Sequence, residues 1–493
     1  MTITELMPFS VLVPLIAALV CALLPGRFWP WAVTLGACIA AAVIAAITLP
    51  AATDLTLSYA FGNWPPPIGI EYRVDAANAF VALLVAGMAA IALTWAKKSV
   101  DQEIPERQGT FYALFLLALA GLLGITLSGD AFNIFVFLEI SSLATYGLIA
   151  HGRDRRALLA SFRYLIMGTV GATFLLIGIG FLYIMTGTLN LADLAERVPE
   201  VRDTSTVRAA LAFIIVGMGI KLALLPLHLW LPNAYTYAPS FVTVFLAGTA
   251  TKVALYVMLR FVYTVFAPDW SFVVLPLSTV FMILGVAGMF VGSWVALFQP
   301  NIKRMLAYSS VAQVGYMVLG VSLASVIGLT AAFLHLFNHA LMKTALFMAV
   351  GTVIYQVGSA RISDFRGLGR TMPWTLTAFA LAGLSIIGIP TTAGFVSKWY
   401  LIQAALEQGQ WFLVVLILIT SLMAVIYIWR VIEAAWFQER DPKQRQVGEA
   451  PLALLIPTWV LVALNFYFGL DTRLTVGGAT AAAEALLGGG IMP

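Results

Sequence analysis

Ionisable side chains inside apolar stretches are the residues of this chain whose chemistry stands out. A charged side chain at the centre of a membrane helix costs about 2.5–3.5 kcal/mol on insertion scales. The four lysines in this set would together cost on the order of 10 kcal/mol unless they are paired or hydrated. Because packing alone does not offset such a cost, the set indicates a path for protons or other ions through a bilayer. Its members are Glu139, Lys221, Lys252, His335, His339, Lys343 and Lys398.

Glu139 and Lys221 are predicted to work together as an electrostatic switch. Glu139 lies roughly two turns into an apolar helix that begins near Asp130, and Lys221 precedes Pro226 in another helix. An ammonium beside a carboxylate changes the proton affinity of both groups, so opening and closing the pair would bind and release a proton. The alternative is a permanent structural ion pair. Asp130 itself is expected to cap its helix.

His335, His339 and Lys343 recur at i, i+4 and i+8, so one face of a helix carries three titratable groups. Histidine titrates near neutrality and suits a relay between lysines. The His-x3-His spacing is also compatible with zinc, but no third ligand accompanies it, so we expect no metal site. Lys343 could instead lie near the membrane edge and extend its ammonium into water.

Three further residues complete the predicted path. Lys252 lies twelve residues into an apolar segment, which is too deep for its ammonium to reach the interface easily. Lys398 follows a predicted helix break and could end the path. His228, which lies just past Pro226, is an additional candidate with either a relay or an interfacial role.

The composition places these residues in a multi-pass membrane protein. The chain has 493 residues, of which 61% are hydrophobic and 10% charged, against about 25% charged in an ordinary soluble protein. The net charge of +4 does not indicate a nucleic-acid partner. Cys21 and Cys38 form no CxxC pair or thiolate cluster, which excludes iron–sulfur and structural zinc sites by ligand number. The N-terminus lacks a basic region, so we expect a retained first helix and no cleaved signal peptide.

Fourteen apolar segments of membrane-spanning length follow one another, so the predicted fold is an all-α integral membrane protein with 14 transmembrane helices. Their approximate limits are 8–25, 29–50, 74–96, 111–128, 130–150, 162–186, 207–228, 240–266, 271–298, 302–326, 329–356, 374–404, 410–437 and 450–470.

Basic residues segregate between the loops that join these segments. The even-numbered connections carry only Arg73, Arg197, Arg202 and Arg208. Because Lys and Arg concentrate in cytoplasmic loops, we expect the odd connections in the cytoplasm and both termini outside it, in the inner (plasma) membrane. The odd connections carry fifteen basic residues: Arg27, Lys97, Lys98, Arg107, Arg153, Arg155, Arg156, Lys303, Arg304, Arg361, Arg366, Arg370, Arg440, Lys443 and Arg445.

The seventh and twelfth helices are predicted to break near Pro226 and Pro390, because proline removes a helix hydrogen bond. The two breaks lie five helices apart and each has a lysine nearby, which indicates an inverted five-helix repeat of helices 4–8 and 9–13. Residues 1–110 would then carry helices 1–3, and 111–266 and 267–437 the two repeats. Residues 438–493 would carry helix 14 and a short tail.

Six ordered motifs resemble the antiporter-like subunits shared by respiratory complex I, Mrp cation/proton antiporters and membrane-bound hydrogenases. The resemblance covers about residues 70–440 and implies a 14-helix fold with an inverted five-helix repeat. The motifs are GDAFNIFVFLE (129–139), GIKLALLPLHLWLPNAYTYAP (219–239), TKVALYVMLR (251–260), NIKRMLAYSSVAQVGYM (301–317), HLFNHALMKTALF (335–347) and GIPTTAGFVSKWYLI (388–402).

The resemblance also implies roles for individual residues. Lysine at 398 is typical of the MrpD type, whereas the NuoM type, which is otherwise similar, bears glutamate there, and the NuoL and MrpA types extend past helix 14. The chain is therefore expected to be closest to MrpD, within a group that also includes NuoN, although residues 232–252 also look like hydrogenase-linked relatives. The relay residues of helices five, seven, eight, eleven and twelve correspond to Glu139, Lys221, Lys252, His335 with His339, and Lys398.

The expected function is that of a proton-translocating subunit in a multi-subunit monovalent cation (Na⁺)/proton antiporter, together with other membrane subunits that include a larger homologue. The alternative is a proton-pumping subunit of a redox-driven complex of the complex I or hydrogenase type. In either case we expect a transporter subunit and no enzyme, because the chain has neither cluster ligands nor a dinucleotide-binding glycine motif. No cofactor is expected.

Overall fold

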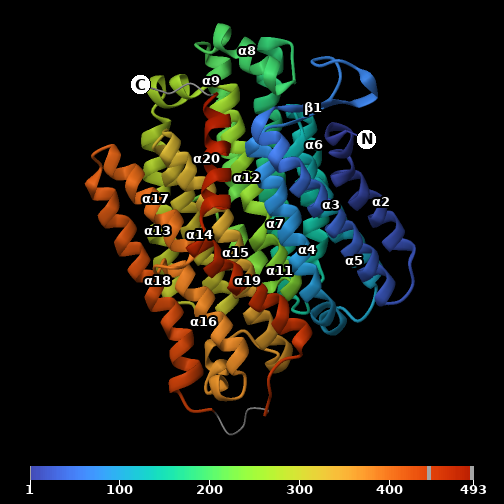
Figure 1. Cartoon of the computed structure of the whole chain (residues 1–493), viewed down its shortest axis with the longest axis vertical. Helices are drawn as coiled ribbons and strands as arrows, with labels where there is room; N and C mark the ends of the chain where they lie inside the picture. The colour runs from blue at the N-terminus through green and yellow to red at the C-terminus, as the bar shows by residue number, and fades with distance from the viewer. Residues whose placement is uncertain (1, 441–445, 489–493) are drawn as a thin grey trace.

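The computed structural model of the protein describes residues 2–440 and 446–488, and nearly all of its ordered elements are helices (Figure 1). Two of the basic residues expected in the cytoplasm, Lys443 and Arg445, lie outside the described residues, as does the end of the predicted tail, 489–493. The α-helices are α1 (Ile3–Leu6), α2 (Phe9–Leu23), α3 (Phe28–Asp54), α4 (Ala76–Glu103), α5 (Gln108–Leu127), α6 (Ala131–Ala150), α7 (Arg156–Thr186), α8 (Leu191–Val201), α9 (Ser205–Leu222), α10 (Trp230–Tyr237), α11 (Ser240–Gly248), α12 (Ala250–Leu259), α13 (Leu277–Leu297), α14 (Ile302–Ser322), α15 (Val326–Val357), α16 (Pro373–Ile387), α17 (Ala393–Glu407), α18 (Trp411–Phe437), α19 (Leu452–Leu470) and α20 (Arg473–Leu487).

Short elements join these helices. The strands β1 (Leu57–Ala60) and β2 (Glu71–Val74) pair antiparallel, with Leu57 opposite Val74. The remaining turns are the 3₁₀ helices η1 (Phe61–Asn63), η4 (Ile362–Phe365) and η5 (Leu368–Arg370) and the π-helical η2 (Arg260–Val265) and η3 (Asp269–Val274).

Thirteen helical segments of the described chain are long and apolar enough to cross a membrane, and α16 is a shorter apolar helix. Because α16 continues after a break as α17, these two helices supply the remaining span and the predicted fourteen are present. Several helices extend beyond the predicted limits. For example, α7 begins at Arg156 and not at 162, since basic side chains continue a helix past its apolar part.

The two five-helix repeats show the same backbone connection in opposite orientations. Asp130, which caps α6, pairs with Asn190, which precedes α8, and Asn301, which caps α14, pairs with Arg361, which precedes η4. The first connection lies beside α8 and the second leads toward α16, at opposite ends of the molecule in Figure 1. The inverted repeat is therefore visible in the hydrogen bonds Ala131 N to Leu189 O (2.8 Å), Leu191 N to Gly129 O (2.9 Å), Ile302 N to Ala360 O (2.8 Å) and Ile362 N to Pro300 O (2.9 Å).

Both predicted helix breaks are present, and they share one conformation. Helix α9 ends where Ala223 takes a left-handed φ of 60°, and α16 ends where Gly388 takes a φ of 87°. The chain resumes as helix at Trp230 and at Ala393, respectively. A left-handed residue ends a helix because it turns the chain away from the axis.

Two features differ from the sequence-based expectation. The segment 240–266, expected as one helix, is interrupted at Thr249, whose φ and ψ are −128° and −61°, between α11 and α12. No proline marks this break. In addition, the segment expected as a short tail contains α20, which packs on α15 and α4.

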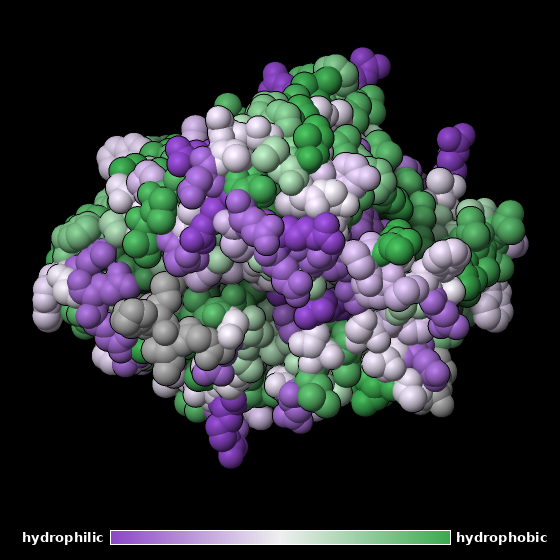
Figure 2. All heavy atoms as spheres, turned by 90° about the horizontal axis from the view of Figure 1, so that it is seen from above, coloured by the Kyte–Doolittle hydropathy of each residue, from purple (hydrophilic) through white to green (hydrophobic). Residues whose placement is uncertain are grey.

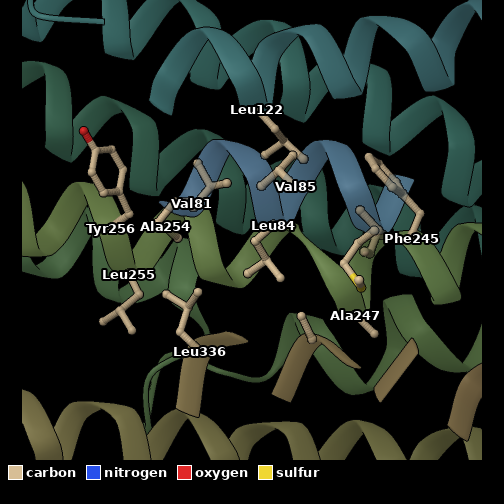
Figure 3. Close-up of a cluster of buried hydrophobic side chains, with 14 of the residues drawn as sticks. Val81, Leu84, Val85, Leu122, Phe245, Ala247, Ala254, Leu255, Tyr256 and Leu336 are labelled. Carbon is tan, nitrogen blue, oxygen red and sulfur yellow. The ribbon is translucent and has the colours of Figure 1, made fainter. Parts of the chain in front are cut away.

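Helix α15 lies at the centre of the molecule and contacts helices of both repeats, among them α11, α14 and α17. The core around α11 and α12 is apolar, and Figure 3 shows Val81, Val85 and Leu122 facing these helices. Large exposed apolar side chains lie instead on outer helices such as α2, α7 and α18, where lipid is expected. At the end that carries α8, polar residues gather near the middle of the face (Figure 2).

Candidate functional site

Helix α15 places His335, His339 and Lys343 on one face, and all three side chains are buried. The rings of His335 and His339 are nearly parallel, with centroids 6.2 Å apart. Lys343 is 0% exposed, and its Nζ donates to Leu306 O at 2.8 Å. Its ammonium therefore does not reach the protein surface, so the snorkelling alternative does not apply to this conformation.

Two polar side chains hold the ring of His335. Its Nδ1 lies 2.9 Å from Ser397 Oγ, and its Nε2 lies 2.9 Å from Gln313 Oε1. Because the amide oxygen of Gln313 only accepts hydrogen bonds, Nε2 carries the proton in this arrangement. By contrast, neither ring nitrogen of His339 has a hydrogen-bond partner among the described residues. The ring of His339 is thus buried without a hydrogen bond to fix which nitrogen carries the proton.

Lys398 lies at one end of the cluster formed by the buried groups of α15. Its Nζ donates to Ile386 O at 2.8 Å, to Ile387 O at 3.0 Å and to Ser421 Oγ at 2.9 Å. The same ammonium lies 4.9 Å from the ring centroid of Tyr316, and that ring lies 5.4 Å from His335. Tyr316 therefore joins Lys398 to the histidines through continuous packing.

Each of three buried lysines lies where a break exposes the carbonyl end of a helix. Lys398 binds the last carbonyls of α16, Lys252 donates to Ala247 O at the end of α11, and Lys221 lies in the last turn of α9. The final carbonyls of a helix lack backbone partners and carry partial negative charge. The breaks therefore provide acceptors for ammonium groups that are away from water.

Glu139 and Lys221 are not in contact in this conformation. Lys221 Nζ donates to Ser142 Oγ at 2.7 Å, and no ion pair in the described ranges joins it to Glu139. The Oε1 atom of Glu139 is buried and has no hydrogen-bond partner among those residues. Because Ser142 lies about one turn beyond Glu139 on α6, Lys221 is bound near its predicted partner but not to it, which we call the open arrangement. This arrangement differs from a permanently closed ion pair.

Lys252 is the remaining candidate that lies close to the histidines of α15. Lys252 is 0% exposed and lies within electrostatic range of both His335 and His339. A cavity of about 30 Å³ lies between Lys221 and α12, the helix that carries Lys252. A space of that size can hold a water molecule.

His228 lies apart from this cluster. The side chain is 7% exposed in the segment between α9 and α10, and its ring packs 6.2 Å from that of Tyr308. Among the described residues, no hydrogen bond joins it to the face of α15.

One end of the molecule holds a buried ion-pair network that sequence analysis missed. Arg260 donates to both carboxylate oxygens of Asp75, at 2.8 and 2.9 Å, and to Asn78 Oδ1 at 2.8 Å. The hydroxyl of Tyr256 accepts a hydrogen bond from Asn78. Burial alone would raise the pKa of the Asp75 carboxyl, but the adjacent guanidinium and the backbone amides at the helix N-terminus hold it below its usual value. A cavity of about 340 Å³ adjoins this network.

The opposite end has a second cavity, of about 350 Å³, lined by Glu103 and Lys303. Lys303 was predicted to be a loop charge, yet it is 5% exposed and its Nζ donates to Ala238 O at 2.6 Å. Glu103 Oε2 accepts a hydrogen bond from Ser240 N at 2.9 Å. The buried cluster of α15 therefore lies between two polar cavities at opposite ends of the molecule.

Comparison with known proteins agrees with this architecture. Residues 128–424 match the family described as NADH:quinone oxidoreductase/Mrp antiporter, TM. The NADH-quinone oxidoreductase subunit N of Desulforudis audaxviator is 46% identical over 415 residues, 82% of each chain. A Na(+)/H(+) antiporter subunit of the D type from Alkalihalophilus pseudofirmus is 31% identical over 408 residues, covering 83% of this chain and 82% of the relative. A chain in the structure of the Mrp complex from Dietzia sp. DQ12-45-1b is similar with a TM-score of 0.90 at 27% identity, covering 99% of this chain and 98% of that chain.

Proposed function

Because this chain belongs to the NADH:quinone oxidoreductase/Mrp antiporter membrane family, we propose that it carries protons across the membrane as a non-catalytic subunit of a larger complex. The observation that carries the proposal is the row of buried titratable groups on α15, with lysines on both sides of it. Such groups are costly in a membrane interior and are typical of proton relays.

In the proposed mechanism, a proton passes from Lys252 to the histidines of α15 and on toward Lys398. Lys398 lies within electrostatic range of His335, and Lys343 within range of His339, so a proton gained at one group weakens proton binding at its neighbours. Repulsion between like charges then disfavours the accumulation of protons in the row.

The Glu139–Lys221 pair is proposed to gate this path. In the open arrangement Lys221 is held by Ser142, and closing the pair would draw the ammonium toward the carboxylate. The closing of the pair would act on Lys252 through the small cavity between Lys221 and α12. His228 is proposed as an additional group near the start of α10, outside the central row.

We propose that the end bearing Glu103 and Lys303 faces the cytoplasm of a cell with this protein in its inner (plasma) membrane. The described basic loops at that end include Arg153, Arg155 and Arg361. Lys and Arg concentrate on the cytoplasmic side of membrane proteins, and this rule supports the assignment. Helix α1 and the last turn of α20 lie at the other end (Figure 1), so both termini are proposed to lie outside the cytoplasm.

The assembly is proposed to be a monovalent cation (Na⁺)/proton antiporter with a larger homologous subunit. The similarity to the Dietzia Mrp complex chain, over 99% of this chain, supports this assignment. A second candidate is a redox-driven proton pump, supported by the relative at 46% identity that is named NADH-quinone oxidoreductase subunit N. The MrpD type was expected from the sequence, and the relatives do not single out that type.

A pull-down of the tagged chain in mild detergent, with the co-purifying subunits identified by mass spectrometry, distinguishes the two assemblies. Small hydrophobic subunits with one larger homologue, and without iron–sulfur proteins, are expected for the antiporter. Recovery of iron–sulfur or hydrogenase-like subunits would instead contradict the antiporter assignment and establish a redox-driven complex.

A further inference from the structure

A pocket rich in arginine lies beside the lipid-facing surface, away from the relay. The cavity has a volume of about 260 Å³ and lies between α7, α10 and α14. Arg156, Arg163 and Arg304 line it together with Asn233, and no carboxylate is among its lining residues. We call this cavity the arginine pocket.

Two of its three guanidinium groups have no partner within the described part of the protein. Arg156 forms an ion pair with Asp154 at 2.6 Å. By contrast, no side-chain hydrogen bond or ion pair within the described residues involves Arg163 or Arg304, and the Nε of Arg304 is buried. A buried donor without a partner carries a free-energy cost of about 1–3 kcal/mol. The arginine pocket therefore offers two guanidinium groups to an anion from outside the chain, that of Arg163 at the surface and that of Arg304 partly buried.

The surroundings of the pocket indicate the form of that anion. Arg163 lies on α7 beside Leu159 and Phe162, which are 48% and 57% exposed. These side chains belong to the outer surface of a membrane-spanning helix, at the end where the basic loops gather. A ligand with a negatively charged head and an apolar tail fits both parts of the surface, whereas a soluble anion fits only one.

We propose that the arginine pocket binds the phosphate group of an anionic phospholipid, whose acyl chains cover the exposed face of α7. Guanidinium groups form paired hydrogen bonds with phosphate oxygens. Basic pockets between helices on the cytoplasmic side of membrane proteins bind lipid headgroups of this kind. The amide of Asn233 adds a neutral donor from α10, so the bound lipid would join α7 to the helix that follows the break in span seven.

Native mass spectrometry of the purified full chain tests this proposal. The delipidated protein is titrated with phosphatidylglycerol, with phosphatidylcholine and with glycerophosphate. The wild-type chain should retain phosphatidylglycerol, and Arg163→Gln should weaken its binding about fivefold, the factor expected for one basic residue at an anionic surface. The double variant R163Q/R304Q should weaken it further.

Arg155→Gln is the matched control. Arg155 is exposed at the same end of α7 but does not line the pocket, so binding should be unchanged in this variant. An equal loss in R155Q and R163Q would overturn the proposal, since it would show diffuse attraction to the basic surface. Equal binding of glycerophosphate, or of phosphatidylcholine, would also overturn it, because neither result requires an anionic lipid.

Discussion

At the scale of single residues, Lys252 and Lys398 are bound by the carbonyl ends of helices and not by carboxylates. Lys398 makes two bonds to the last carbonyls of α16, and Lys252 donates to the carbonyl end of α11. Carbonyl acceptors stabilise an ammonium without holding it as tightly as a carboxylate ion pair would. Such binding suits the proposed relay, which requires a lysine that can give up its proton.

The open Glu139–Lys221 pair gives the first prediction. Glu139→Gln removes the charge that would draw Lys221 away from Ser142. An adjacent opposite charge changes proton affinity by about one unit or more, so proton flux through the assembled complex should fall at least about tenfold. Flux is measured with a pH-sensitive dye in vesicles, and assembly by native gel. Glu200→Gln, on exposed α8, is the control and should leave flux unchanged; wild-type flux in E139Q would contradict the gating role.

The Asp75–Arg260 pair gives a stability prediction. Asp75→Asn leaves a buried guanidinium without its carboxylate and should lower the free energy of unfolding by about 3 kcal/mol. Since the folded pKa of Asp75 lies below its unfolded value, the pair stabilises the fold above the unfolded pKa of about 3.9. That contribution is lost as the pH falls through the folded pKa.

Thermal unfolding in detergent between pH 5 and pH 3 measures this effect. The wild type should lose stability over that interval, and D75N should lose less. Asp471 serves as the control: its neighbour Arg473 lowers the pKa of Asp471 to about 2, but the pair is exposed. Asp471→Asn should therefore barely change the melting temperature. A D75N protein as stable as the wild type would show that the buried pair is not stabilising.

At the scale of helices, apolar runs were enough to predict all fourteen spans, and proline predicted two of the breaks. The break at Thr249 was missed because its sequence, Gly248-Thr249, contains no residue that is incompatible with a helix. Tertiary packing determines it instead, since Gly248 lies so close to Thr344 that a Cβ would approach its hydroxyl to 2.6 Å. Helix α20 was missed because its 15 residues are fewer than the roughly 20 that a membrane span needs.

Close packing of α7 on α9 gives the prediction at this scale. A Cβ at Gly217 would lie 2.6 Å from Gly171 O, so Gly217→Leu must separate the two helices. Overpacking of this kind typically costs about 1–3 kcal/mol, and the melting temperature should fall. Gly180→Leu is the matched control on α7, because nothing lies within 4 Å of a Cβ there. Equal melting temperatures for the two variants would contradict the packing described.

At the scale of the whole molecule, the charged candidates could be found from the sequence because ionisable residues stand out in apolar runs. The uncharged residues that bind these candidates could not be found from the sequence. Gln313 and Ser397 are ordinary polar residues until the fold brings them to His335. Lys303 was assigned to a loop because a sequence does not show that a helix end is buried under neighbouring segments.

The proposed sidedness is tested by cysteine labelling. The native Cys21 and Cys38 are both buried and should not react. Arg155→Cys should react with a membrane-impermeant maleimide only in inverted vesicles, and Glu200→Cys only in intact cells. The reverse pattern would place the basic end outside the cytoplasm.

The most direct test of the proton path is the substitution Lys252→Met in the assembled complex, with flux measured in vesicles. Positioned proton-transfer groups contribute about 10²–10⁴-fold to rates, so we expect proton flux to fall about 100-fold while the complex remains assembled. Lys98→Met, which changes an exposed lysine of α4, should leave flux at the wild-type level. Wild-type flux in an intact K252M complex would contradict the account, because protons would then cross without the buried lysine.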